Sequence, residues 1–287
     1  MQSDLKCIPC IFRQVLAAVE RVKAPQESKL AAFHEAARLV PRLDMRRPPS
    51  VNSHVVLKKV NHVLGCADPY SREKKHYNAL ALRLLPRLRR LAEKSSDPLR
   101  AAVKIAAAGN VIDLGINPVF DVEATIDEVM RDGFARDHFQ AFRRELARAK
   151  QVLYLLDNAG EIVFDMVLLE RLGGREVTAV VNSGPIINDA TLEDARQVGL
   201  AKLVRVMASG SDTIGKLPAA GSAELQRAFG GADLIIAKGH GNYENLEDTG
   251  ANVFFLLRAK CDVVAASLGV RVGQTVFVRR GLGSDRS

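Results

Sequence analysis

The chain has 287 residues, of which 47% are hydrophobic and 26% charged, and this composition excludes a wholly disordered protein. Four cysteines are too few for a disulfide-stapled secreted scaffold, and no uncharged apolar run reaches the roughly 18 residues of a membrane span, so we expect a soluble cytoplasmic protein. Although the pI is about 9.5, only 5% of the residues are aromatic and none is tryptophan, which argues against a nucleic-acid partner.

Residues 1–148 are predicted to form a helical N-terminal domain, because apolar residues recur there at three- and four-residue spacing. Pro86 is expected to kink or split the segment that contains it. This part also carries the excess of positive charge, which favours an anionic small substrate, although a merely solvated basic surface would give the same pattern. The expected helices are Ile11–Val22, Leu30–Val40, Ala79–Ala92 and Leu99–Ala108.

Residues 149–287 are predicted to form a Rossmann-like α/β domain that binds metal and phosphate. Short apolar runs alternate there with helical segments, which is typical of a doubly wound, mostly parallel sheet with helices on both faces. The expected strands are Val152–Leu156, Val177–Val181, Leu203–Met207, Leu234–Ala237, Val263–Ala265 and Val276–Val278. The expected helices are Val163–Leu172, Thr191–Val198, Ala223–Phe229 and Asn252–Leu257.

Polar side chains follow the first two of these strands, at the edge where such sheets bind their ligands. Asp157 and Asn158 leave the first strand together, and Asp189 follows the second in a similar setting. If the two strands are neighbours, these three residues could hold one divalent cation such as Mg²⁺ or Mn²⁺, which prefers oxygen ligands. The same residues could instead cap the helices that follow them.

A lysine and two glycines follow the fourth strand. Lys238 precedes Gly239 and Gly241, so backbone amides in this segment could approach a phosphate while the ammonium group balances its charge. Together with a metal, this loop would suit phosphoryl transfer to water, with Lys238 stabilising charge on the phosphoryl oxygens. Asp157 or Glu161 would orient the attacking water, and the sequence does not separate the two candidates.

Two other features admit both a functional and a structural interpretation. Cys7 and Cys10 form a CxxC pair that could serve a metal or redox role or simply pack in a helix. His240 could act as a general acid for the leaving alcohol, or it could be an exposed loop histidine.

Seven sequence blocks, in order, resemble the domain-of-unknown-function-eighty-nine family, the metal-dependent damage-control phosphatases. The CxxC points to the prokaryotic branch of that family. The blocks are CIPC followed by RQ (Cys7 to Gln14), DPY (Asp68–Tyr70) with Asn78, GNVID (Gly109–Asp113), DNAGE (Asp157–Glu161), GPIINDAT (Gly184–Thr191), KGHGNYE (Lys238–Glu244) and LRAKC (Leu257–Cys261).

The resemblance implies a helical region packed on a doubly wound α/β domain. It also implies that Asp157, Asn158 and Asp189 bind a divalent metal ion, which in this family is Mn²⁺, Co²⁺, Ni²⁺ or Mg²⁺. The substrate contacts expected on the same basis are Gly239, Gly241, Asn242, Asn110, Asp68 and Lys260. Lys260 is expected to precede a strand, which would place it at the end of the sheet opposite the site. Asn110 and Asp113 could equally be loop or capping residues.

The sequence therefore favours a metal-dependent phosphatase that hydrolyses a small phosphorylated metabolite, such as a sugar, nucleotide or cofactor phosphate, in metabolite damage control. A protein that binds such a metabolite without turnover would need the same residues. A carboxyl methyltransferase that uses S-adenosylmethionine is disfavoured, because the first strand lacks the glycine-rich loop expected for that cofactor.

Overall fold

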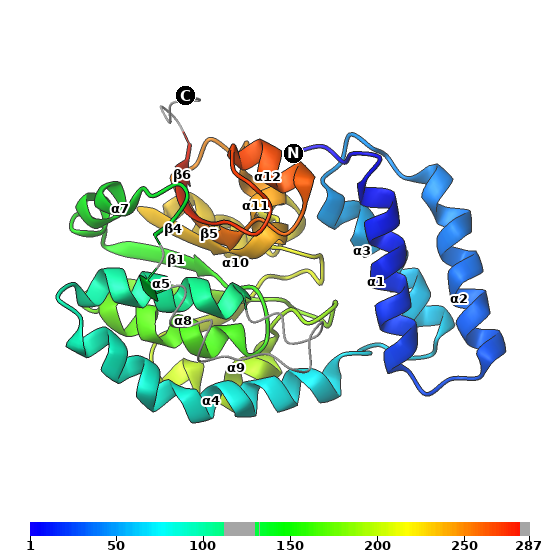
Figure 1. Ribbon diagram of the computed structural model, residues 1–287, viewed down its shortest axis with the longest axis horizontal. Coiled ribbons are helices and arrows are strands. Elements are labelled where there is room, and N and C mark those ends of the chain that lie inside the picture. Colours follow the sequence, from blue (N-terminus) through cyan, green and yellow to red (C-terminus); the bar gives the residue numbers. More distant parts are fainter. Residues whose placement is uncertain (112–129, 132, 282–287) are drawn as a thin grey trace.

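The computed structural model describes residues 1–111, 130–131 and 133–281, and it has the expected α/β architecture (Figure 1). Six strands form one sheet in the order β3-β2-β1-β4-β5-β6, in which only β6 runs antiparallel to its neighbour. The strands are β1 (Gln151–Leu155), β2 (Glu176–Val181), β3 (Arg205–Ala208), β4 (Leu234–Lys238), β5 (Val253–Arg258) and β6 (Thr275–Arg280). The prediction of a doubly wound, mostly parallel sheet is confirmed.

Helices cover both faces of the sheet because successive residues of its strands are apolar and point to opposite sides. In β1, Val152 and Tyr154 join the core on one face, while Leu153 and Leu155 join the core on the other. The helices of the first face are α4 (Ser71–Lys94), α5 (Pro98–Val111), α7 (Phe139–Leu146), α8 (Glu161–Leu169) and α9 (Leu192–Val198). Those of the second face are α10 (Ala223–Gly231), α11 (Gly239–Leu246) and α12 (Asp262–Leu268).

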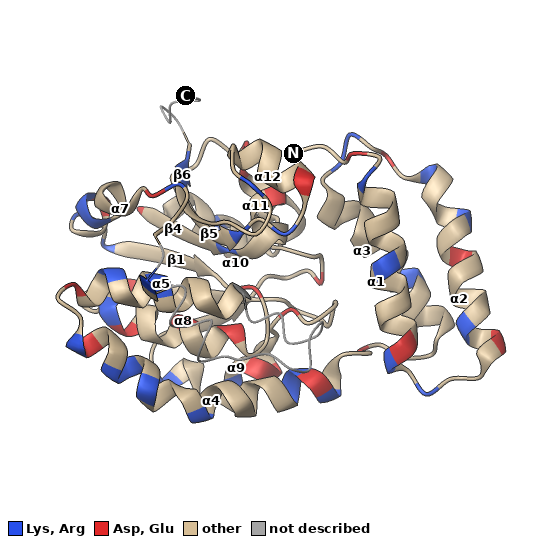
Figure 2. Cartoon of the chain, viewed as in Figure 1, with Lys and Arg blue, Asp and Glu red and all other residues tan. Residues whose placement is uncertain are grey.

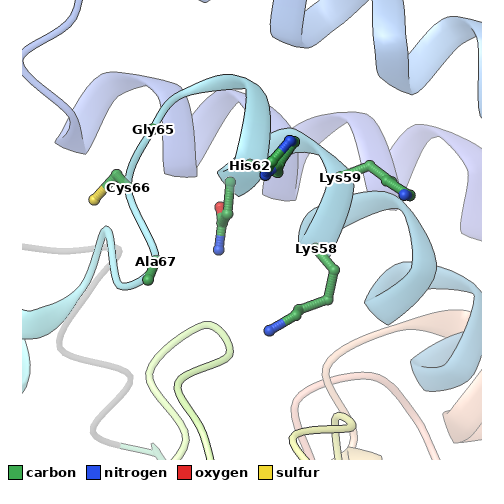
Figure 3. A pocket seen from close by; sticks show the side chains of 7 residues that line it. Lys58, Lys59, His62, Gly65, Cys66 and Ala67 are labelled. Carbon is green, nitrogen blue, oxygen red and sulfur yellow. The ribbon is translucent and has the colours of Figure 1, made fainter.

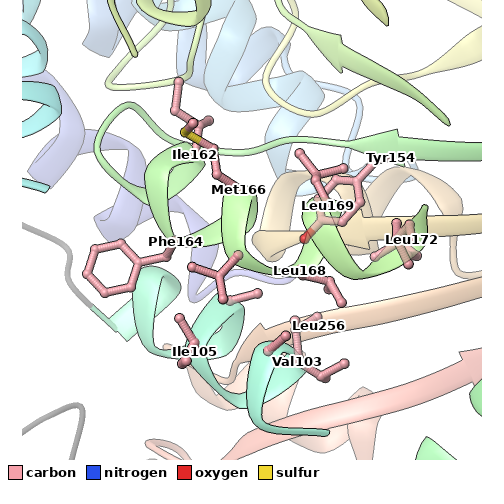
Figure 4. Close-up of a cluster of buried hydrophobic side chains, with 14 of the residues drawn as sticks. Val103, Ile105, Tyr154, Ile162, Phe164, Met166, Leu168, Leu169, Leu172 and Leu256 are labelled. Atoms are coloured by element: carbon pink, nitrogen blue, oxygen red, sulfur yellow. The ribbon is translucent and has the colours of Figure 1, made fainter. Parts of the chain in front are cut away.

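Helix α8 is the buried centre of the first layer, and all nine of its residues are buried. Figure 4 shows Leu168 of this helix near Val103 of α5 and Leu256 of the sheet. A helix with apolar residues on every side needs such an enclosed position, and its two carboxylates, Glu161 and Asp165, are buried with it. Because α4 and α5 supply part of the enclosure, one hydrophobic core crosses residue 148, where the sequence places a domain boundary. The division into two domains stays a prediction.

Three further helices pack together beside the sheet: α1 (Cys7–Arg21), α2 (Gln26–Leu39) and α3 (Pro49–Val63) (Figure 1). Their shared core includes Ile11, Val15 and Val60, and it also receives Ile186 from the segment after β2. This helical unit is therefore attached to the end of the sheet by apolar contacts. Short 3₁₀ turns occur at Val40–Arg42, Glu170–Leu172, Leu200–Lys202 and Pro218–Ala220.

Two of the expected elements are wrong. The segment expected as a helix at Asn252–Leu257 is strand β5, and the expected strand Val263–Ala265 lies within helix α12. A short apolar run does not by itself distinguish a buried strand from a buried helix. Residues 253–258 form strand β5 because they are buried on both faces and pair with β4 and β6. Residues 263–265 belong to helix α12, which ends at Gly269 in the left-handed conformation, with φ +66°.

The remaining differences concern helices. Pro86 lies inside α4 without splitting it, because that helix runs unbroken from Ser71 to Lys94. Helices α3, α7 and α11 were not expected, and α11 begins inside the KGHGNYE segment that the sequence suggested was a loop.

The basic residues of the first half lie mainly on outer helix faces, as Figure 2 shows along α4 and at α7. Arg83 and Arg90 of α4 are exposed, as are Arg143 and Arg144 of α7. This distribution agrees with a solvated basic surface. Among the described residues, no helix combines the length and the apolar character needed to cross a membrane.

Helix α11 carries a buried carboxyl group at its junction with α3. Glu244 is 8% exposed, and it accepts a hydrogen bond from the backbone N–H of Ser50 at 2.7 Å. Burial raises the pKa of Glu244 to about 7.

This buried carboxyl group predicts a pH-dependent stability. Between its ordinary pKa of 4.5 and about 7, the folded protein retains a proton on Glu244 that the unfolded chain releases, so the free energy of unfolding should fall as the pH rises. The shift corresponds to about 3 kcal/mol at most. Urea denaturation at pH 5 and pH 8 should show that Glu244→Gln loses less stability than the unmodified protein over this interval. Equal losses in the two proteins would contradict the prediction.

Candidate active site at the carboxyl edge of the sheet

The site lies where the strand order reverses, between β1 and β4. The chain leaves β1 toward β2 on one side, whereas β4 begins the other half of the sheet, so the connections after these two strands diverge. Asp157 and Asn158 follow β1 directly, and Lys238 is the last residue of β4. Sequence position alone therefore brings a carboxylate, an amide and a lysine to the same edge.

The segments after β1 and β2 meet, as the sequence analysis expects if these strands are neighbours. The backbone N–H of Ala190 donates to the carbonyl of Asp157 at 2.8 Å, and a β-bridge joins Asn158 to Asp189. Both Asp157 and Asp189 are buried. The three residues that the sequence suggests as metal ligands thus lie together.

The segment that carries Asp189 is held in a strained conformation. Ile187 has φ +44°, in the left-handed region that β-branched residues rarely adopt. Its neighbour Ile186 is fully enclosed in the core of α1, α2 and α3, and Ile187 packs against that core too. The helical unit therefore fixes the backbone two residues before Asp189.

Two amide side chains connect the carboxylates of Asp157 and Glu161. Asn110 of α5 donates to Asp157 Oδ2 at 3.3 Å and to Glu161 Oε2 at 3.2 Å. Asn158 donates to the same two oxygens at 2.9 Å and 3.1 Å. The Oδ1 atom of Asn110 accepts the backbone N–H of Arg258 at 3.1 Å, which connects α5 with the end of β5.

Lys238 is fully buried, and all three of its N–H groups are used within the protein. Its Nζ atom donates to Glu161 Oε1 at 2.7 Å, to Asp165 Oδ1 at 2.6 Å and to the carbonyl of Ala106 at 2.9 Å. Although burial lowers it, the charges of Asp165 and Glu161 hold the pKa of Lys238 above its usual range. Lys238 therefore has no hydrogen-bond donor left for a phosphoryl oxygen in this conformation.

Asp157 has the opposite surroundings, because no cation bonds to its carboxylate among the described residues. Burial, and then the charges of Glu161 and Asp189, raise the pKa of Asp157 well above its usual range. Burial also raises the pKa of Asp189. This part of the edge is therefore electronegative.

The donor chemistry of Asp157, Asn158 and Asp189 fits a hard divalent cation, because among the described residues no cation is hydrogen-bonded to either buried carboxylate, and the amide of Asn158 bonds to Asp157. Within residues 1–111 and 133–281, no group of three or more His, Cys, Asp or Glu side chains could hold a metal ion. The amide of Asn158 would thus have to complete the site. Its nitrogen now faces the carboxylates, so it would have to turn its oxygen toward the ion.

Gly239 packs directly against the carboxylate of Asp157. Its φ is +75°, and a Cβ atom there would lie 1.8 Å from Asp157 Oδ2. Only glycine fits this position, because any side chain would displace the carboxylate. Gly239 is the first residue of α11, so this helix begins beside Asp157.

Gly241 and Asn242 hold α11 against the segment that follows β3. A Cβ atom at Gly241 would lie 3.0 Å from the backbone nitrogen of Gly215. Asn242 is buried, donates to the carbonyl of Lys238 at 2.7 Å and accepts the backbone N–H of Lys216 at 2.7 Å. The contacts of these two residues, which the sequence suggests as substrate contacts, are thus with the protein itself.

Lys260 lies at the same edge as Asp157, contrary to expectation, because the preceding segment is strand β5 and not a helix. It is exposed, and its positive charge acts to lower the pKa of Asp157, against the stronger effects of burial. His240 is half-buried in α11 and not in an exposed loop. Its Nε2 atom lies 2.8 Å from the carbonyl of Arg258 and 2.9 Å from the backbone nitrogen of Lys260.

Asp68 reaches the site through a chain of polar contacts. Its carboxylate pairs with Lys74 at 3.1 Å, and Lys74 lies 3.3 Å from Asp194. Asn78 donates to Asp194 at 2.9 Å and accepts the backbone N–H of Gly160 at 2.7 Å. Asp68 therefore supports the turn between β1 and α8 from a distance, through Asn78.

The cysteines are free thiols, and their role stays open. Cys7 begins α1 and Cys261 caps α12, and an ion pair of 3.1 Å between Lys6 and Asp262 joins these two helix ends. Asp113 lies outside the described residues.

A basic pocket of about 520 Å³ opens beside α3 (Figure 3). Lys58 reaches from it to Asp212, in the segment after β3, with 2.5 Å between Nζ and Oδ2. That segment continues to Lys216. The lining residues are Lys58, Lys59, Asn61, His62, Gly65, Cys66 and Ala67.

Sequence analysis missed two charged residues of the site. Asp165 is the one charged residue in the apolar run from Ile162 to Leu169, a pattern that indicates a buried ion pair. Lys216 gives no such signal, because it follows the polar segment after β3 as a surface lysine would. It is fully buried, and its Nζ atom lies 3.7 Å from Asp189 Oδ2.

Comparison with known proteins shows that this chain is similar in sequence to damage-control phosphatases. The family model described as "damage-control phosphatase ARMT1-like domain" matches residues 3–276. The chain is 33% identical to a damage-control phosphatase of Pyrococcus horikoshii, over 97% of this chain and 98% of the relative. It is 34% identical to a damage-control phosphatase of Archaeoglobus fulgidus, over 94% and 96% of the two chains. A crystal structure of a DUF89 family protein from Pyrococcus horikoshii superposes with a TM-score of 0.91 at 33% identity, covering 98% of this chain and 99% of that one.

Lys238→Met should destabilise the fold, because it leaves Glu161 and Asp165 buried without their cation. We expect the free energy of unfolding to fall by about 3 to 5 kcal/mol. The double variant Lys238→Met with Asp165→Asn should recover part of this loss in urea denaturation. A loss below about 1 kcal/mol in the single variant would contradict a structural role for the lysine.

Gly239→Ala should lower activity strongly, since the new methyl group overlaps the Asp157 carboxylate. Gly230→Ala is the matched control, because nothing lies within 4 Å of a Cβ atom at that position of α10. We expect turnover to fall at least about 10-fold in the first variant and to change little in the second, as misplacing a reacting group is costly. Equal activity in the two variants would show that the contact is unimportant.

Proposed function

The chain belongs to the damage-control phosphatase ARMT1-like family, and we propose from this premise that it hydrolyses a small phosphorylated metabolite with a divalent metal ion bound at the carboxyl edge of the sheet. The observation that carries the proposal is the pair of buried carboxylates, Asp157 and Asp189, which lie together without a hydrogen-bonded cation among the described residues. Buried carboxylates of this kind are normally neutralised by a proton or by a bound cation.

We propose Asp157, Asn158 and Asp189 as the metal ligands, and Mn²⁺, Co²⁺, Ni²⁺ or Mg²⁺ as the ion. When bound, such an ion polarises the phosphoryl group and makes a water molecule a stronger nucleophile. The two carboxylates and the amide offer the oxygen ligands that hard cations prefer.

The hydrogen bonds of the site favour different roles for the carboxylates of Asp157 and Glu161. Glu161 is occupied by Lys238, Asn110 and Asn158, so we assign it, together with Lys238, to positioning. Asp157 accepts side-chain hydrogen bonds from described residues only at Oδ2, and it lies against Gly239 at the start of α11. Of the two candidates left open by the sequence, we therefore choose Asp157 as the group that contacts the reacting atoms.

The surroundings of the site favour an anionic substrate, such as a sugar, nucleotide or cofactor phosphate. The first turn of α11 presents backbone N–H groups beside Asp157, and helix N-termini of this kind favour phosphate. Lys260 is an exposed cation at the same edge, and we propose it as a substrate contact. Lys58 and Lys59 add positive charge to the pocket beside α3.

Phosphate release after chelation, with and without added metal, tests the proposal. We expect chelation to stop hydrolysis of an aryl phosphate and of a panel of metabolite phosphates, and re-addition of Mn²⁺, Co²⁺, Ni²⁺ or Mg²⁺ to restore it. Asp157→Ala should lower turnover at least about 100-fold without unfolding the protein, because the carboxylate has no ion pair with a described residue to lose.

The exposed residue Asp248 provides the matched control, and Asp248→Ala should retain full activity. Hydrolysis that survives both chelation and Asp157→Ala would overturn the assignment. Binding of metabolite phosphates without release over many turnovers would instead indicate a non-catalytic binding protein.

A further inference from the structure

Lys216 has a fully buried ammonium group with no hydrogen-bond partner among the described residues. The nearest carboxylate oxygen, Asp189 Oδ2, is 3.7 Å away, which is an ion-pair contact but too long for a hydrogen bond. A buried charge without hydrogen bonds destabilises a fold by several kcal/mol. The stability of the unliganded protein therefore does not explain this lysine.

The backbone of Lys216 is fixed in place. Its N–H donates to Asn242 Oδ1 at 2.7 Å, and Asn242 in turn donates to the carbonyl of Lys238 at 2.7 Å. The preceding residue, Gly215, has φ +73°, and a Cβ atom there would lie 2.3 Å from the carbonyl oxygen of Gly241. The segment after β3 is thus clamped to the start of α11, so the side chain extends from a rigid base.

The two fully buried lysines of the site differ in whether the hydrogen-bond donors of their ammonium groups are used. Lys238 uses its three donors on Glu161, Asp165 and Ala106, whereas those of Lys216 meet no acceptor in the described structure. Lys216 is also close enough to Asp157 for its charge to act on that carboxylate. Its open donors therefore lie beside Asp189 and within electrostatic reach of Asp157.

We propose that Lys216 binds an oxygen of the substrate's phosphate group. A phosphate offers several strong oxygen acceptors and negative charge in one compact group, which is what a rigid, dehydrated ammonium lacks here. The inference rests on the proposed function for the identity of the anion, and it assigns to Lys216 the contact that sequence analysis gave to Lys238. Lys216 would then be the substrate-binding lysine, and Lys238 the structural one.

Binding of inorganic phosphate tests this assignment without requiring turnover. Isothermal titration with phosphate, at saturating Mn²⁺, should show that Lys216→Met and Lys216→Gln weaken binding about 10- to 100-fold. Lys202→Met, which removes an exposed lysine and the same charge, should bind phosphate as the unmodified protein does. Mn²⁺ affinity, measured separately, should be unchanged or tighter in the Lys216 variants, because a cation beside the carboxylates is gone.

The outcomes separate this inference from the proposed function. Phosphate affinity that is equal in Lys216→Met and in the unmodified protein would overturn the role of Lys216, even if phosphatase activity is found. Loss of phosphate binding in both Lys216 variants, in a protein that hydrolyses nothing, would support the role and reject the phosphatase. Failure of both variants to fold would show that the ammonium is structural and would also overturn the inference, as would an unmodified protein that binds no phosphate.

Discussion

The ammonium group of Lys238, buried between Glu161 and Asp165, holds the two halves of the sheet edge together. Lys238 ends β4, whereas both carboxylates belong to α8, the helix that follows β1. The strand order reverses between β1 and β4, so the segments that follow these two strands lead away from each other. The ion pairs join them across that point, and the Tyr154 hydroxyl reinforces the network by donating to Asp165 at 2.7 Å.

This network also determines which carboxylates lack a hydrogen-bonded cation. Because Lys238 is shared by Glu161 and Asp165, it is not available to Asp157 or Asp189. The amides of Asn110 and Asn158 bond to Asp157 but bring no positive charge. The unbalanced negative charge is thus concentrated on the side of the edge that faces Asp189 and Lys216. Such concentration is typical of sites that bind ions or charged substrates.

The sequence was sufficient for the fold class and for placing the proposed site residues at one edge of the sheet, because both depend on local pattern. Asp157 closely follows the apolar run of β1, Asp189 lies in the polar segment that follows β2, and parallel strands present their ends at one edge. Strand order was not predictable, because an apolar run indicates a strand without naming its neighbour. Glycines suggest turns, so the sequence predicts a loop where α11 begins, whereas Gly239 is required there by the close approach of Asp157.

Lys216 shows a different limit. Nothing in its local sequence distinguishes it from a solvated lysine, and its burial results from contacts with α11, which is remote in the chain. The error at β5 had a similar origin, since pairing with β4 and β6 decided between two conformations that the apolar run allowed equally. Tertiary contacts, which a single sequence does not display, determined both.

The attachment of Ile186 and Ile187 to the α1, α2 and α3 unit has a thermodynamic consequence. The strained backbone at Ile187 persists because packing against these helices offsets its cost, and Asp189 follows two residues later. Ligand binding at Asp189 and docking of the helical unit are therefore linked equilibria. A ligand that favours the present position of Asp189 makes the docking of the helices more favourable. A change that loosens the docking of the helices makes ligand binding less favourable by the same free energy.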